Sequence, residues 1–76
     1  MVWEIEGYEL ELTRDGDSFL LIHPKWSIEG IGQTPIAAEA DLRHSAWILF
    51  DMMGHWPDLS SEAMDMMAFC EKVMLT

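Results

Sequence analysis

Acidic and apolar side chains alternate along the N-terminal segment from Val2 to Thr13. The segment carries four glutamates and, between them, large apolar residues: Glu4, Glu6, Glu9 and Glu11, and Trp3, Ile5, Tyr8, Leu10 and Leu12. Successive side chains of a β-strand point to opposite faces, so a period of two is typical of a strand that is buried on one side. The segment therefore predicts a strand with an acidic, solvated face.

The alternation changes parity at Gly7, because Trp3 and Ile5 occupy odd positions whereas Leu10 and Leu12 occupy even ones. A one-residue β-bulge at Gly7 would keep a single strand and gather all four glutamates on one face. Alternatively, Gly7 is a break between two short segments, which would place the two glutamate pairs on opposite faces. The sequence supports both interpretations equally.

Two further strands are expected downstream. The stretch from Arg14 to Asp17 contains Gly16 and predicts a tight turn, and Ser18 to His23 predicts a second, almost wholly apolar strand. Pro24-Lys25 makes the next turn, and Trp26, Ile28 and Glu29 predict a third strand that ends near Gly30 and Gly32. Together these segments predict a three-stranded antiparallel sheet.

Two helices follow the strands. Thr34-Pro35 is a typical helix start, and Gly54 is placed to end that helix after Met53. Its inward stripe is predicted to be Ala38, Leu42, Ser45, Ala46, Leu49, Met52 and Met53, and the flanking Trp47 and Phe50 indicate cover on more than one side. Ser60-Ser61-Glu62 begins a last helix whose inward stripe is Ala63, Met66, Met67, Cys70, Val73 and Met74.

This order predicts a single α+β domain over residues 1–76, β-β-β-α-α, with the main helix packed on one sheet face. A chain of 76 residues leaves no room for a second core. Its single cysteine and its acidic N-terminus indicate a cytoplasmic protein without a secretory signal. The uncharged runs are far shorter than the roughly 20 residues that span a bilayer.

The balance of charge disfavours several partners. Fourteen acidic residues face four basic ones, and the net charge is -10. Phosphates and anionic lipid headgroups would be repelled, so we expect neither direct nucleic-acid binding nor membrane binding.

Catalysis is also not expected. The chain has no Gly-rich phosphate loop, no Ser-His-Asp order and no Cys-X-X-Cys pair. His23, His44 and His55 are too widely spaced for a local zinc motif, and Cys70 lies on an apolar stripe where an inert buried thiol is usual. We therefore expect a non-enzymatic protein without cofactor or metal.

The acidic positions are the candidate binding site for a basic partner protein. They lie in the first predicted strand, in the turn after it and on the third predicted strand: Glu4, Glu6, Glu9, Glu11, Asp15, Asp17 and Glu29. Such a surface could compete with nucleic acid for the Lys and Arg clusters of a nucleic-acid-handling protein. A face that serves only solubility explains the same pattern equally well.

The central segment resembles the N-terminal domain of HicB-like antitoxins. The matching residues are Pro24, Gly30 or Gly32, Gln33, Thr34, Pro35, Ala38, Leu42 and Arg43, and they span a third to a half of the chain. The resemblance implies a helix packed on one face of a three-stranded sheet, and an antitoxin that neutralises a small basic ribonuclease. Ile36-Ala37 departs from the usual acidic helix start, and no DNA-reading segment follows.

Small size, acidity and lack of catalytic motifs also resemble phage-encoded anti-CRISPR proteins. That resemblance implies an inhibitor, monomeric or dimeric, that acts in the cytoplasm of a bacterial host. It would bind the DNA-recognising subunit of a CRISPR effector and block DNA binding by mimicry or occlusion. A third hypothesis is a homo-oligomeric structural or assembly protein that associates through Trp56, Met64 and Phe69.

Overall fold

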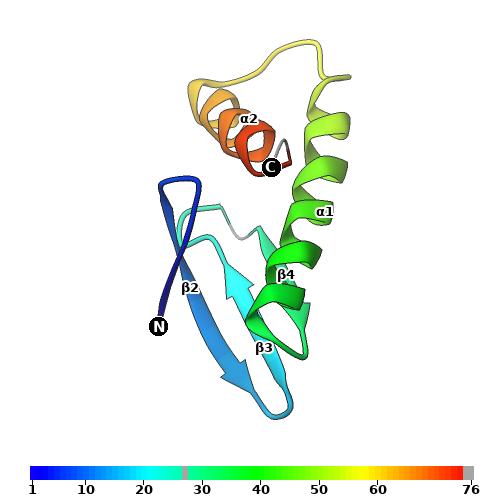
Figure 1. The fold of residues 1–76 in the computed structure, drawn as a ribbon. Coiled ribbons are helices and arrows are strands. Elements are labelled where there is room, and N and C mark those ends of the chain that lie inside the picture. Colours follow the sequence, from blue (N-terminus) through cyan, green and yellow to red (C-terminus); the bar gives the residue numbers. More distant parts are fainter. Residues whose placement is uncertain (27, 75–76) are drawn as a thin grey trace.

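The computed structural model describes residues 1–26 and 28–74 and shows an α+β fold (Figure 1). The strands come first and the helices follow: β1 (Val2–Ile5), β2 (Tyr8–Asp15), β3 (Ser18–Ile22), β4 (Glu29–Gly32), α1 (Pro35–Met53) and α2 (Ser61–Met74). The four strands form one antiparallel sheet in the order β1-β2-β3-β4. The expected class is confirmed, but the expected count of three strands is wrong.

The additional strand arises at Gly7, where the chain turns back on itself. Ile5 pairs with Tyr8, so Glu6 and Gly7 form a two-residue hairpin turn between β1 and β2. Both turn residues have positive φ, 51° at Glu6 and 83° at Gly7, as the preferred tight hairpin turns require. The bulge interpretation is therefore wrong. The break interpretation correctly separates two segments, but the pairing register does not place the glutamate pairs on opposite faces.

Helix α1 begins and ends where the sequence predicts. The Thr34 side chain accepts a hydrogen bond from the Ala37 amide at 3.0 Å, Pro35 occupies the first turn, and Gly54 follows the last residue, Met53. Ser60 caps α2 in the same way, since its hydroxyl accepts from the Ala63 amide at 3.1 Å. Local capping chemistry is thus sufficient to define both helix starts.

Glycines in β4 let α1 pack unusually close to the sheet. A Cβ atom at Gly30 would lie 2.3 Å from the Ala38 carbonyl oxygen and from the Leu42 amide nitrogen. At Gly32 it would lie 2.6 Å from the Ala38 nitrogen. Helix backbone therefore rests directly on strand backbone, and only glycine fits at these positions.

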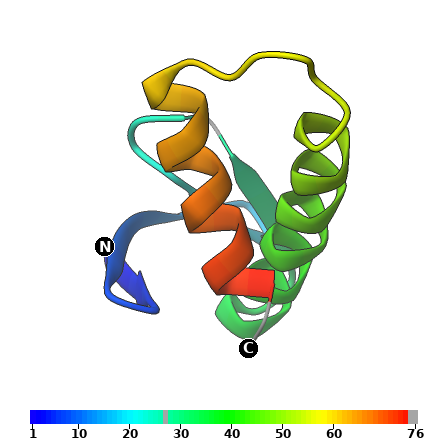
Figure 2. The ribbon, with the colours of Figure 1, turned by 90° about the horizontal axis from the view of Figure 1, so that it is seen from above.

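The core lies between the sheet and the two helices. Figures 1 and 2 together show α1 running alongside β4, and α2 lying across the upper end of the sheet at a steep angle to α1. The buried residues come from all of these layers: Ile5, Leu10, Leu12, Leu21, Ile28, Ala38, Leu42, Ala46, Met53, Phe69, Cys70 and Val73. One continuous core thus holds the six elements together.

Some expectations for the helix faces need correction. Phe69 lies outside the narrow stripe predicted for α2 and widens the core, because it is fully buried against Tyr8 and His23. Met52, predicted to face inward, is 52% exposed, and Trp47 is also more than half exposed. The sheet and α2 therefore leave α1 uncovered on sides where the sequence indicated cover.

Candidate protein-binding surface

Cross-strand pairing assembles the acidic positions on the sheet face that points away from the buried core. Val2, Glu11, Ile22 and Glu29 pair in succession across the four strands, so their side chains share one face. Leu12 and Leu21, which lie beside Glu11 and Ile22 in their strands, are buried on the opposite face. The uncovered face thus carries carboxylates from β2 and β4.

The β1–β2 hairpin adds a further carboxylate to this face. Glu4 pairs with Glu9, and Glu9 lies two residues from Glu11 on the same strand. Residues directly opposite each other in an antiparallel sheet have Cα atoms about 4.5–5.5 Å apart, and same-face neighbours along a strand lie about 6.8 Å apart. We call the four residues Glu4, Glu9, Glu11 and Glu29 the acidic sheet face.

The other predicted binding residues lie at the margins. Asp15 ends β2 with the same parity as Glu9 and Glu11, so it extends the acidic sheet face toward the β2–β3 turn. Asp17 lies in that turn, at the far end of the molecule from α2 (Figure 1). Glu6 lies in the β1–β2 turn. The structure therefore brings four of the seven predicted residues together and places three beyond them.

Within residues 1–26 and 28–74, no ion pair joins a Lys or Arg side chain to the acidic sheet face. Arg14 has the opposite parity on β2 and lies 5.8 Å from the Phe19 ring centroid. Lys25 lies over the Trp26 ring at 5.4 Å, Arg43 pairs with Glu39 on α1, and Lys72 is on α2. The Met1 ammonium, which donates to the Leu12 carbonyl at 3.2 Å, is a cation close to Glu9 and Glu11. The four carboxylates outnumber it, so the face keeps an excess of negative charge.

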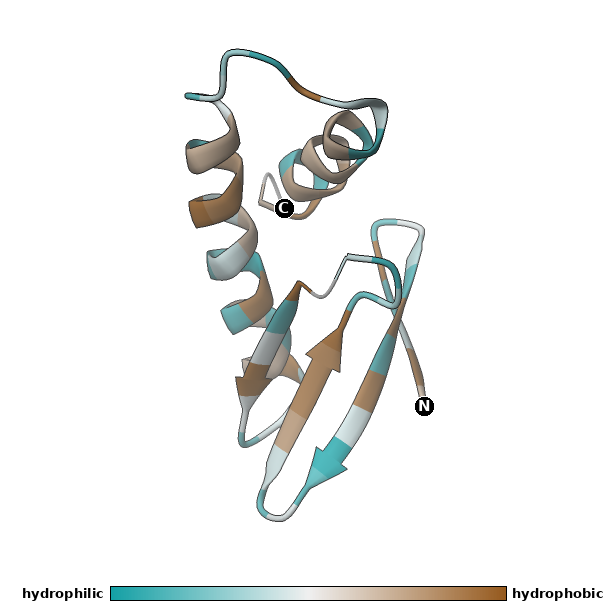
Figure 3. Cartoon of the chain, turned by 180° about the vertical axis from the view of Figure 1, so that it is seen from behind, coloured by the Kyte–Doolittle hydropathy of each residue, from teal (hydrophilic) through white to brown (hydrophobic). Residues whose placement is uncertain are grey.

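Apolar side chains share this face with the carboxylates. Val2 and Ile31 are more than half exposed, and Leu20 and Ile22 between them are partly buried. Figure 3, seen from behind, shows β3 as a hydrophobic strand beside the alternating pattern of β2. A partner that docked here would bury apolar surface and also contact the negatively charged glutamates. Protein interfaces commonly combine an apolar centre with polar surroundings.

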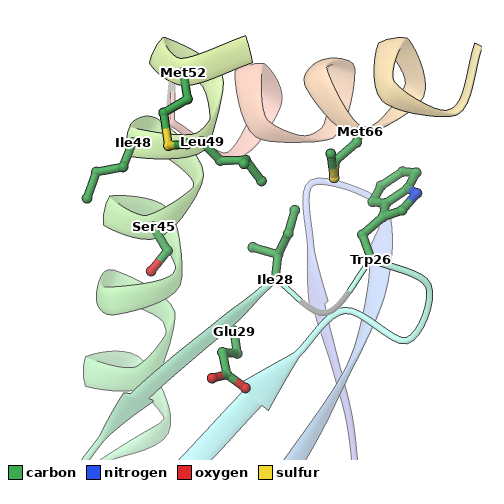
Figure 4. Close-up of a pocket in the computed structure, with 8 residues that line it drawn as sticks. All are labelled: Trp26, Ile28, Glu29, Ser45, Ile48, Leu49, Met52 and Met66. Atoms are coloured by element: carbon green, nitrogen blue, oxygen red, sulfur yellow. The ribbon is translucent and has the colours of Figure 1, made fainter. Parts of the chain in front are cut away.

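An open apolar groove adjoins the acidic sheet face where β4 begins (Figure 4). Its volume is about 490 Å³, and its lining comes from α1, from α2 and from β4 with the loop before it: Trp26, Ile28, Glu29, Ser45, Ile48, Leu49, Met52 and Met66. Glu29 provides the one charged side chain of this lining. We call this feature the apolar groove, and it touches the acidic sheet face through Glu29.

Asp41 caps one backbone amide at the exposed edge of β4, beside the groove. Its carboxylate accepts a hydrogen bond from the Ile31 amide at 2.9 Å. An unpaired edge amide is a template for another strand, and this contact occupies one of those on β4. Approach along β4 is therefore better suited to side chains than to an added strand.

His23 belongs to a buried aromatic cluster. Its ring stacks on Trp26 at a centroid distance of 4.4 Å, and its Nδ1 accepts a hydrogen bond from the Lys25 amide at 3.1 Å. Burial, with the nearby charge of Lys25, lowers the pKa of His23 below 6.5. This histidine therefore stays neutral and structural at neutral pH.

Cys70 is likewise structural. It is fully buried, and burial raises the pKa of its thiol to about 11. Thiolate is the reactive form, so little of it exists at neutral pH. The sequence interpretation of Cys70 as a buried thiol agrees with its position in the core.

Trp3, Glu39 and Arg43 connect β1 to both helices. The Trp3 indole donates to the Glu39 carboxylate at 2.8 Å, Arg43 pairs with the same carboxylate at 3.0 Å, and the Arg43 guanidinium donates to the Val73 carbonyl. Burial alone would raise the pKa of Glu39, but these hydrogen bonds and the Arg43 charge outweigh it and lower that pKa below 4.5.

Two further findings concern only residues 1–26 and 28–74. Within these ranges no helix combines the length and the apolar character that crossing a membrane requires. Within the same ranges, no three His, Cys, Asp or Glu side chains come together as a metal site would require.

No protein-family model, curated protein or solved structure matches this chain. The resemblances to HicB-like antitoxins and to anti-CRISPR proteins therefore stay predictions. A functional proposal for this chain therefore rests on the geometry and charge of its surface.

The apolar groove was missed by sequence reasoning because its lining comes from segments far apart in the chain. The available signal was the excess of apolar residues on α1, where Trp47 and Ile48 fall outside the narrow inward stripe. That excess of apolar residues indicated that other elements cover more than one side of α1. It did not indicate which part of the helix surface would stay exposed.

Proposed function

We propose that this chain is a non-enzymatic, cytoplasmic inhibitor that docks its acidic sheet face onto a basic nucleic-acid-handling protein and blocks DNA binding by that protein. The proposal rests on one observation: Glu4, Glu9, Glu11 and Glu29 share an uncovered face and, in the part of the chain that the structure describes, form no ion pair with a Lys or Arg side chain. Charge of one sign on a rigid sheet steers association with a surface of the other sign.

The hairpin adds a carboxylate beside the row on β2. A single strand would offer one carboxylate per about 6.8 Å, whereas each DNA strand carries a phosphate every 3.4 Å of rise. The row on β2 is therefore sparser than a DNA strand, and Glu4, directly opposite Glu9, raises the density of charge by lying beside that row. This density of charge supports competition for Lys and Arg clusters that otherwise hold phosphates.

The DNA-recognising subunit of a CRISPR effector is one partner of this class, and a small basic ribonuclease neutralised by an antitoxin is another. Both present cationic surfaces built for nucleic acid, so the acidic sheet face supports the shared chemistry. The two are separated by what is inhibited, DNA binding in the first case and RNA cleavage in the second.

Self-association has weaker support. Phe69, one of the three residues predicted to mediate it, is fully buried, although Trp56 and Met64 are exposed. Two copies would also bring together two net charges of -10. A basic partner removes that repulsion, whereas a second copy doubles it.

The test is affinity capture from a bacterial lysate at low and at high salt, with the Glu9→Lys/Glu11→Lys variant beside the natural chain. Asp65→Lys/Glu71→Lys is the matched control, because it changes the net charge equally at exposed positions of α2. We expect a basic nucleic-acid-binding protein to be captured by the natural chain and by the control, and lost with the strand variant or at high salt. The captured protein must then lose its nucleic acid when the chain is added.

Equal capture by both charge variants would contradict the proposal. So would a captured protein that still binds its nucleic acid in the presence of saturating chain.

A further inference from the structure

We propose that the apolar groove is an anchor pocket that receives an apolar side chain of the partner, presented within a basic segment that crosses the acidic sheet face. This inference rests on the proposed function, and it adds the chemistry by which the partner is held. Electrostatic attraction alone gives fast association, whereas a buried anchor supplies most of the affinity of typical interfaces.

The groove and the acidic sheet face are parts of one continuous surface. Glu29 lines the groove, and the same residue begins the cross-strand row that continues through Ile22 to Glu11. Adjacent strands lie about 4.8 Å apart, so the backbones at Glu29 and Glu11 are about 10 Å apart. An extended partner segment covers that distance in about three residues. A side chain in the groove thus places its neighbours within reach of the carboxylates.

The lining selects an apolar anchor. Ile28 and Leu49 offer aliphatic surface, and the Met52 and Met66 thioethers adapt to the shape of what they contact (Figure 4). Ser45 and Glu29 are the polar members, and the Glu29 carboxylate extends from β4 away from the apolar side chains of the groove (Figure 4). An aliphatic or aromatic side chain fits this chemistry, and a charged one does not.

Charge complementarity decides the occupant. A segment with Lys and Arg on the side of its anchor that crosses the sheet would meet Glu29 and Glu11 together, and it would reduce the excess negative charge of the face. A second copy of this chain carries only four basic side chains against fourteen acidic ones. The surface therefore fits a basic partner segment rather than itself.

The inference is tested with two synthetic peptides of equal length and equal positive charge. One peptide carries Leu in the middle of a run of Lys and Arg, and the other carries Ser at that position. We expect the Leu peptide to bind the natural chain about tenfold more tightly, a difference of about 1.4 kcal/mol, in fluorescence anisotropy at low salt. Both peptides should bind more weakly to Glu9→Lys/Glu11→Lys.

A matched pair of variants locates the anchor. Ile48→Ser/Met52→Ser changes two groove residues that are 43% and 52% exposed, and Ile36→Ser/Met64→Ser changes the same residue types at exposed positions outside the groove. The preference for the Leu peptide should disappear in the first variant and persist in the second. Because all four side chains are exposed, both variants should fold, which unfolding curves would verify.

Three other outcomes would overturn either the anchor pocket or the proposed function. Equal binding of the two peptides, weakened by Glu9→Lys/Glu11→Lys, would overturn the anchor pocket and leave the acidic sheet face as the docking surface. No binding of either peptide at low salt would contradict the proposed function itself. Concentration-dependent dimerisation in sedimentation, abolished by Ile48→Ser/Met52→Ser, would show that a second copy occupies the groove and would also overturn the inference.

Discussion

Different interactions dominate the two faces of the sheet. On the face toward the helices, Leu21 is fully buried and Gly30 brings strand backbone against helix backbone. On the opposite face, Glu4 lies across from Glu9, where like charges disfavour folding, and Ile31 stays exposed. Packing explains the first face. On the second face, the pairing of like charges lowers stability.

Leu21→Ala against Ile31→Thr should give the largest contrast between the faces. Removing the fully buried leucine leaves a cavity and should lower the free energy of unfolding by about 2–5 kcal/mol. Ile31 is 56% exposed, and threonine keeps its β-branched shape, so that change should stay within about 0.5 kcal/mol. Urea unfolding measures both. Similar losses of unfolding free energy at the two positions would contradict the exposure of Ile31 on the outer face.

Gly30→Ala tests the close approach between β4 and α1. Its Cβ would lie 2.3 Å from helix backbone, which cannot move aside as a side chain can, so we expect a loss of about 1–3 kcal/mol or more. Gly54→Ala is the control, because its Cβ would make only an ordinary contact at 3.4 Å and its φ is -63°. That control should be neutral or stabilising by up to about 1 kcal/mol. A neutral Gly30→Ala would contradict the backbone contact.

Trp3→Phe tests the polar connection on the covered face. The variant loses the hydrogen bond from the indole to the Glu39 carboxylate, and we expect a loss of about 1–2 kcal/mol at neutral pH. Because the fold lowers the pKa of Glu39, its contribution is present above the ordinary value of 4.5 and is lost as pH falls through the folded value. Unfolding curves of the variant and the natural chain should therefore differ at neutral pH and coincide at acidic pH. A constant difference would show that lost packing, not the carboxylate, is responsible.

Glu9→Gln should give the smallest effect, in the opposite direction. It removes the repulsion from Glu4 and Glu11 and should stabilise the fold by about 0.5 kcal/mol at low salt. The gain should vanish at high salt, where exposed charges are screened. Thermal unfolding at two salt concentrations measures it, with Asp65→Asn on α2 as control. A loss of stability would mean that Glu9 has a favourable contact in the folded chain.

The parts of the fold that depend on local chemistry were predictable. Thr34, Pro35 and Gly54 define α1 by capping and conformational preference, and the apolar run from Phe19 to Ile22 predicts a strand. The count of strands was not predictable, because a parity change at Gly7 is consistent with a bulge, a break or a turn. Pairing of Ile5 with Tyr8 decided it.

The candidate site was predictable to the same extent. The acidic positions follow from their alternation, but their common face depends on the hairpin register, which places Glu4 opposite Glu9. The apolar groove required long-range packing: Trp26, Leu49 and Met66 meet only once α2 lies across the end of the sheet. Residues separated this far in sequence leave no periodic pattern to find.

The burial of Cys70 makes this chain convenient for chemical labelling. Because that thiol is fully buried and its pKa is raised to about 11, a maleimide at neutral pH would leave it unmodified in the folded protein. A cysteine introduced as Ile31→Cys, at an exposed position beside Glu29, would react alone. A fluorophore attached there would report contact with the sheet in real time, without replacing the native cysteine.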